Sequence, residues 1–189
     1  LGSASPHLVR ALTDVPWPQV VLASTALAAL GGLVVLLAVR DGPFAAPRAR
    51  FQPRFILQAM SQRGLRLANL GYLGHMWELY AMWTWIPVFL MQGLALRGAS
   101  AAMAGLLSFG VIGVGGLGCV VAGRLADRLG RTAVTSGAMV ISGSAALLAA
   151  ALTGAPLAVL VPVLFVWGVS IVADSAQFSA AITELSPPE

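Results

Sequence analysis

Long apolar runs separated by short polar segments make up most of the chain. The runs cover residues 18–39, 67–90, 100–122, 133–153 and 156–178. A helix needs about 20 residues, at a rise of 1.5 Å per residue, to cross the hydrocarbon core of a bilayer. The pattern therefore predicts an all-α integral membrane protein, a polytopic helix bundle with about five transmembrane helices.

Composition supports a membrane protein and excludes a soluble fold. Hydrophobic residues make up 58% of the 189 residues, charged residues only 10%, and the mean hydropathy is +0.87, whereas about 25% of the residues of a soluble domain are charged. The net charge of +4 would fit a nucleic-acid partner, but the arginines lie at run ends and in one linker, so we expect no nucleic acid. The single Cys119 excludes an internal disulfide, and His7 and His75 are too far apart in sequence to suggest a local metal site. We expect no metal and no cofactor.

The distribution of arginine predicts the topology. Six of the eleven arginines lie in residues 40–66 and three in residues 123–132. Because cytoplasmic loops are enriched in basic residues, both segments are predicted to be cytoplasmic. Residues 1–17 then form an external segment, and residues 67–178 hold four transmembrane helices. Residues 179–189 are predicted to be a cytoplasmic segment that leads to a further helix.

One polar segment carries a motif. Residues 123–132 read Gly-Arg-Leu-Ala-Asp-Arg-Leu-Gly-Arg-Thr. Gly130 permits a tight reversal, Gly123 permits close helix contact, and Asp127 needs Arg128, Arg131 or a helix N-terminus as a partner. The segment resembles the signature loop of the major facilitator superfamily, in which Thr132 stands at a position that is usually basic.

The resemblance implies a function and a place in the fold. Three apolar runs precede the loop, so the chain resembles a fragment holding helices six to ten of a twelve-helix transporter, with residues 40–66 as the central loop. The implied function is secondary active transport of a small solute by alternating access. The implied partners are the lipid bilayer, the solute, protons and the remaining helices. Arg-only, Ala- and Gly-rich usage suggests a bacterial cell (inner) membrane.

A non-transporting structural membrane subunit remains the alternative. An enzyme is not expected, because the chain has no G-x-S-x-G, no H-E-x-x-H and no Cys/His cluster. Residues 113–118 match the G-x-G-x-x-G dinucleotide fingerprint, but these glycines lie inside an apolar run and no strand is expected before them. The solute, the direction of transport, the coupling ion and the oligomeric state stay open.

The run 67–90 holds the candidate transport site. At 100° per residue, Gly71, His75, Glu78 and Met82 share one face, which we predict to turn toward the transport cavity. Glu78 lies near the bilayer midplane, where a carboxylate facing lipid costs about 3 kcal/mol. We expect Glu78 to couple transport to protons with the help of His75. The alternative is a structural acid hydrogen-bonded to a neighbouring helix.

Three further features are interpreted structurally. Asp174 is expected to be a satisfied acid near the cytoplasmic boundary. The i+4 ladder of Ala138, Ser142, Ala146 and Ala150 predicts a helix-packing seam. A bend is expected near Pro162 and Gly168.

Overall fold

The computed structural model describes residues 3–13, 15–40, 53–98 and 100–186, and these residues are almost entirely helical. The helices are, in chain order, α1 Ser5–Leu12, α2 Trp17–Ala38, α3 Arg54–Ser61, α4 Arg63–Ala95, α5 Ala101–Gly113, α6 Gly115–Leu129, α7 Arg131–Ala151, α8 Leu157–Ala173 and α9 Ser175–Leu185. The all-α helix bundle that the hydropathy pattern predicts is confirmed.

Among the residues that the structure describes, four segments are long and apolar enough to cross a membrane. They are Trp17–Ala38, Ala101–Leu129, Arg131–Ala151 and Leu157–Leu185. The 33-residue α4 is longer than any of them, but its polar residues keep it out of this set. α4 contains the run 67–90, and its crossing of the membrane stays a prediction.

Most predicted boundaries shift by a few residues. α4 extends to Arg63 and Ala95, and α9 extends the last span to Leu185, so most of the predicted cytoplasmic segment 179–189 is helical. The short helix α3 lies within the arginine-rich linker 40–66, of which residues 41–52 fall outside the described part.

Proline does not break the helices, and the bend expected near Pro162 and Gly168 stays a prediction. Pro87 lies inside α4 and Pro162 inside α8, and both helices continue past it. The helical ladder is interrupted instead at Val114, between α5 and α6, and at Asp174, between α8 and α9. The second interruption places a carboxylate at the junction of two helices.

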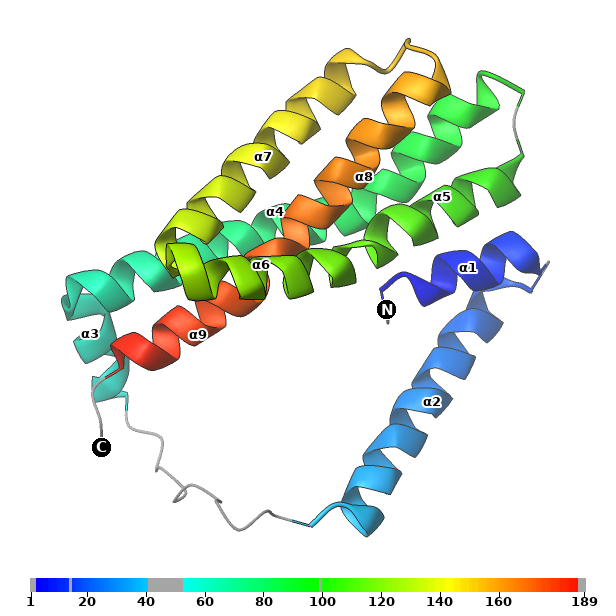
Figure 1. Cartoon of the computed structure of the whole chain (residues 1–189). Coiled ribbons are helices and arrows are strands. Elements are labelled where there is room, and N and C mark those ends of the chain that lie inside the picture. Colours follow the sequence, from blue (N-terminus) through cyan, green and yellow to red (C-terminus); the bar gives the residue numbers. More distant parts are fainter. Residues whose placement is uncertain (1–2, 14, 41–52, 99, 187–189) are drawn as a thin grey trace.

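The hydrophobic core lies between α4, α5 and α8. Leu79, Met82, Ile86 and Leu90 are buried along α4 at spacings of three and four residues. They pack in one cluster with side chains of α5 and α8 that include Leu164, which is fully buried. α8 thus runs through the middle of the bundle, with α7 beside it (Figure 1).

The seam on α7 differs from the predicted ladder. Ala138 and Ser142 are buried as expected, whereas Ala150 is exposed. The other buried positions are Thr135, Ala145 and Ala149. A straight α-helix keeps one face by alternating steps of three and four residues, which a strict i+4 ladder does not do.

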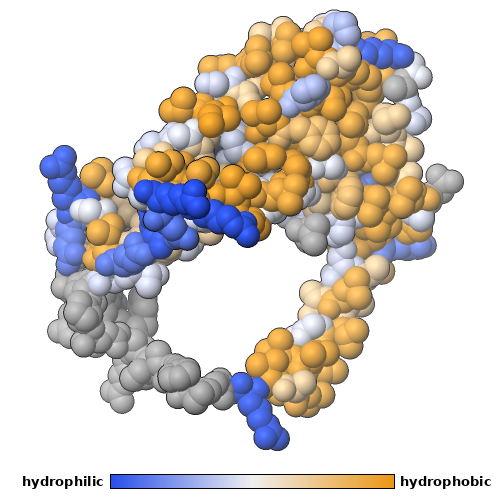
Figure 2. Space-filling view, in the orientation of Figure 1, coloured by the Kyte–Doolittle hydropathy of each residue, from blue (hydrophilic) through white to orange (hydrophobic). Residues whose placement is uncertain are grey.

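The two N-terminal helices pack differently. α1 lies against α5, where a Cβ at Gly105 would come within 2.8 Å of the Cβ of Ala11. α2 leans away from the bundle (Figure 1), and Val20 is its only buried residue. In Figure 2 hydrophobic residues cover much of α2 and much of the bundle face in view, with hydrophilic residues gathered mainly near helix ends. This surface suits lipid or further helices.

Arg97, beyond the end of α4, is held by backbone carbonyls. Its guanidinium donates to the carbonyls of Gly93 at 2.8 Å, Thr153 at 2.8 Å and Ala155 at 2.7 Å. Arg97 therefore ties the end of α4 to the turn between α7 and α8.

Candidate functional site

A buried histidine and a buried acid meet between α4 and the junction of α8 and α9. His75 is 0% exposed and Asp174 is 1% exposed. Nδ1 of His75 lies 2.9 Å from Oδ1 of Asp174. This is an ion-pair distance, but the angles are not those of a hydrogen bond, and neither atom has a hydrogen-bond partner among the described residues. Nδ1 of His75 and Oδ1 of Asp174 are therefore polar neighbours of each other.

The other ring nitrogen of His75 reaches α9. Nε2 lies 2.6 Å from Oγ of Ser175, and which of the two donates depends on the tautomer of the ring. His75 thus bridges two consecutive residues, Asp174 and Ser175, at the point where the helical ladder is interrupted.

Two aromatic rings shield this cluster. The ring centroid of Tyr72 lies 6.1 Å from that of His75, with the planes 15° apart, and the centroid of Phe178 lies 5.7 Å away. Phe178 itself is 7% exposed. The imidazole is therefore fixed in orientation and separated from the surroundings of the bundle.

The order Asp174, His75, Ser175 is that of a serine-hydrolase triad, with Nδ1 toward the acid and Nε2 toward the hydroxyl. A nucleophilic serine also needs access for a substrate and donors for the oxyanion. The histidine at the centre of this cluster is fully buried. The geometry therefore does not support a nucleophilic serine here.

Glu78, the predicted functional acid, also has a partner on another helix. The hydroxyl of Ser142 on α7 donates to Oε1 of Glu78. Ser142 is 1% exposed, while Glu78 is half-buried. If Glu78 is a structural acid, it needs a hydrogen bond to a neighbouring helix, and this contact is such a bond. Because Glu78 is only half-buried, part of its side chain remains near the surface of α4.

The predicted cavity face of α4 is largely a packing face. Met82 is 2% exposed and packs in the core with Leu79 and Ile86. His75 is buried against Asp174 as described. Of the predicted site residues His75, Glu78 and Met82, only Glu78 is not buried in the described chain.

The open surface of α4 lies on another side of the helix. Trp77, Tyr80 and Trp85 are 82%, 57% and 65% exposed. With Thr84 and neighbouring residues they line a groove of about 580 Å³. Residues three positions apart are neighbours on the surface of a helix. Glu78 precedes Ala81, which lines this aromatic groove, by three positions, so Glu78 lies at the edge of the groove.

The predicted loop 123–132 is much shorter than expected. Residues up to Leu129 belong to α6, and α7 begins at Arg131. Gly130 is the only residue between them, and its φ of +85° is in the region that favours glycine. A Cβ at Gly123 would meet nothing within 4 Å, so the close helix contact expected there is not made in the described chain.

Arg131 joins this connection to α9. Its Nε and Nη2 donate to the two carboxylate oxygens of Glu184, at 2.8 and 2.6 Å. Its Nη1 donates to Oε1 of the buried Gln177 at 2.7 Å. Asp127 and Arg128 are exposed, and neither forms an ion pair within the described residues. Arg131 therefore pairs with α9 rather than with Asp127.

Charge reversal tests the contact of Arg131 with Glu184, which we call the clamp. Arg131→Glu should lower the melting temperature of the purified protein, because two carboxylates would then face each other. The double variant Arg131→Glu with Glu184→Arg should recover part of the loss. We expect a small effect, since both members of the pair are partly exposed and solvent screens their charges. Arg128→Glu is the matched control, and an equal loss there would contradict the clamp.

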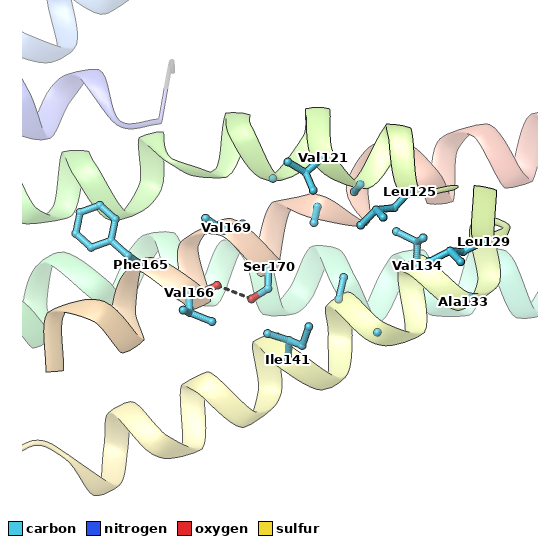
Figure 3. Close-up of a pocket in the computed structure, with 15 residues that line it drawn as sticks. Val121, Leu125, Leu129, Ala133, Val134, Ile141, Phe165, Val166, Val169 and Ser170 are labelled. Atoms are coloured by element: carbon cyan, nitrogen blue, oxygen red, sulfur yellow. Dashed lines mark hydrogen bonds between the residues drawn. The ribbon is translucent and has the colours of Figure 1, made fainter. Parts of the chain in front are cut away.

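A second groove lies between α6, α7 and α8 and holds about 580 Å³. Figure 3 shows its apolar lining, with Val121 and Leu125 from α6, Ile141 from α7 and Val169 from α8. The one polar side chain shown there, Ser170, donates its hydroxyl to the carbonyl of Val166 at 2.8 Å. This groove offers no free group for a polar solute.

Comparison with protein families decides the identity of the chain. The model of the Major Facilitator Superfamily matches residues 2–189. The chain belongs to this superfamily. The resemblance in residues 123–132 is thereby confirmed, and the chain is that of a membrane transporter family. No curated protein and no solved structure matches the chain.

For each of three contacts between helices in this chain, the sequence predicted one of the two residues and not the contact itself. It selected His75, Glu78 and Arg131. It named Ser142 only as part of a packing seam, and it named neither Ser175 nor Glu184. It interpreted Asp174 as a boundary acid, although a charge inside the apolar run 156–178 was a signal for a buried partner.

Proposed function

We propose that the chain is part of a secondary active transporter that moves a small solute by alternating access, coupled to protons. The observation that carries the proposal is the pair of ionisable groups on α4, His75 and Glu78, each bonded to another helix of the bundle. Ionisable residues within membrane-spanning bundles are rare, and they mark solute and proton pathways by default.

Glu78 is the group that we assign to the solute side. It is half-buried, and the helical period places it next to the aromatic groove on α4, although it is not one of the residues that line the groove. Its hydrogen bond to Ser142 holds the carboxylate in place. Trp and Tyr side chains supply apolar faces and polar edges, which suits the recognition of a small organic solute.

Alternating access needs contacts that can part and reform. The contact of Arg131 with Glu184 and the contact of His75 with Ser175 both connect α9 to other helices. Changing the balance between two conformations by a few kcal/mol is enough to shift their populations strongly. A structural subunit without transport is the alternative function, and in it Glu78 would only hold α4 to α7 through Ser142.

The test uses the protein expressed at the full length of its reading frame and reconstituted in liposomes that contain a pH-sensitive dye. A panel of sugars, amino acids, carboxylic acids and organic cations is added outside. We expect at least one class to change the internal pH, with no change in protein-free liposomes. Entry of a radiolabelled solute without a pH response would contradict proton coupling, and absence of both responses across the panel would favour the structural subunit.

A further inference from the structure

The short helix α3 exposes apolar side chains on one side. Ile56, Leu57 and Met60 are 56%, 75% and 39% exposed. At 100° per residue these three positions fall within an arc of about 100°. α3 packs against α4, and this packing leaves the apolar side of α3 largely uncovered in the described chain. A helix with such a side suits the boundary between water and lipid.

α3 also lies at the level of the lipid headgroups. It is found at the end of the bundle where α4 begins and α9 ends (Figure 1). A Cβ at Gly64, just after α3, would lie 3.6 Å from Cδ2 of Leu185, the last residue of the candidate span Leu157–Leu185. The 29 residues of this span extend over about 43 Å, and the hydrocarbon core is about 30 Å thick. When the span is centred, its ends therefore lie about 6 Å outside the hydrocarbon core, among the headgroups.

Basic side chains without acidic partners accompany this helix. Between residues 42 and 77 the chain has five arginines and no aspartate or glutamate. Two of the five, Arg63 and Arg66, are exposed at the start of α4. Neither forms an ion pair with another described residue. Nη1 of Arg66 donates to the carbonyl of Met60 at 3.3 Å, so this guanidinium lies beside the last turn of α3.

This combination of groups suits an anionic phospholipid. The headgroup phosphate supplies the negative charge that Arg63 and Arg66 lack, and guanidinium groups bind phosphate through two parallel hydrogen bonds. The acyl chains begin only a few ångströms deeper, where the apolar side of α3 can be buried. A free anion would leave that apolar side in water. An acidic segment of another protein would have to displace lipid at this level.

We propose that α3, together with Arg63 and Arg66, forms a docking site for anionic phospholipid. Ile56, Leu57 and Met60 enter the outer part of the acyl region, and the two guanidinium groups bind headgroup phosphates. The site holds the start of α4 at the membrane surface. It is independent of the proposed function, since neither a solute nor a coupled proton takes part in it, and lipid binding is measurable without either.

A fluorophore at position 57 tests the site in the full-length protein. Leu57→Cys, in a background with Cys119→Ala, is labelled with a dye whose emission reports the polarity around it. Because Leu57 is 75% exposed, the substitution and the dye disturb little packing. The protein is reconstituted in nanodiscs of phosphatidylcholine with a rising fraction of phosphatidylglycerol. We expect the emission to move to shorter wavelength as phosphatidylglycerol increases, and high salt should weaken this response because it screens the charges.

Variants of the two arginines separate charge from apolar insertion. Arg63→Gln with Arg66→Gln should lose almost all of the response over the same range of phosphatidylglycerol. Each basic residue near an anionic surface contributes about fivefold in affinity, and two therefore contribute about 25-fold. Arg124→Gln with Arg128→Gln is the matched control, because it removes two exposed arginines of α6. This control should leave the response at position 57 unchanged.

A conservative pair keeps the result interpretable if the glutamine variants fold poorly. Arg63→Lys with Arg66→Lys retains both charges and should retain most of the response, and a loss as large as that of the glutamine pair would overturn the proposal. An equal emission in phosphatidylcholine alone would also overturn it, since charge would then play no part. The same shift on adding inorganic phosphate to phosphatidylcholine nanodiscs would indicate a site for a free anion instead. A dye that reports water at every lipid composition would mean that the surface of α3 binds a protein and not lipid.

Discussion

Replacing Gly168 by alanine is expected to leave little folded protein. α8 crosses α5 at this glycine, and a Cβ there would overlap the carbonyl oxygen of Val111 and come within 2.9 Å of its carbonyl carbon. Both atoms are backbone, so no side-chain rotation relieves the contact. The only relief is a shift of one helix away from the other, in the middle of the core that contains Val111 and Leu164.

The expected loss is large relative to the stability of a protein. Overpacking a core costs about 1–3 kcal/mol even where side chains can adjust, and native proteins are stable by only about 5–15 kcal/mol. Gly118→Ala should act similarly, because a Cβ there would overlap the carbonyl oxygen of Val169. Thermal unfolding in detergent, with the yield of monodisperse protein, measures both variants.

Gly116 offers a matched control two residues from Gly118. It lies on the same helix α6, but a Cβ at Gly116 would meet nothing within 4 Å. Gly116→Ala should therefore keep or slightly raise the melting temperature, since alanine favours a helix by about 1 kcal/mol over glycine. A loss as large as that of Gly168→Ala would mean that glycine acts here through flexibility and not through close helix packing.

The fold was predictable from the sequence because apolar length is a direct signal for membrane helices. The run 18–39 and α2 Trp17–Ala38 nearly coincide, since a bilayer leaves few alternatives to a helix for an apolar segment. The signature in residues 123–132 identified the superfamily correctly. The same segment was expected to be a loop because it is charged, yet α6 continues to Leu129 and only Gly130 is non-helical.

The contacts of the candidate site were much less predictable. Hydropathy shows that His75 and Glu78 are unusual residues in a span, but it does not show which helix packs against each of them. Asp174 lies about one hundred positions from His75 in sequence, and their contact depends on how α4 crosses the junction of α8 and α9. Likewise, the helical period placed Met82 beside Glu78, and only the packing of the core shows that Met82 is buried.

Glu78→Gln is expected to remove most of the solute-driven proton flux of the reconstituted full-length protein while leaving its fold intact. Glutamine keeps a carbonyl oxygen that accepts the hydrogen bond from Ser142, so the contact between α4 and α7 survives. It cannot ionise, so a role that needs the negative charge is lost. Dye-reported internal pH and thermal unfolding, measured on the same preparation, separate these two effects.

Ser142→Ala makes the complementary change, because it removes the hydrogen-bond donor and keeps the carboxylate. A hydrogen bond to a charged group contributes about 1.5–3 kcal/mol, so this variant should unfold at a lower temperature than wild type and still move protons below that temperature. If Glu78 is only a structural acid, the results invert: Glu78→Gln then retains full proton flux and its pH dependence. The two variants together thus distinguish a charge that acts in transport from a hydrogen bond that holds α4 to α7.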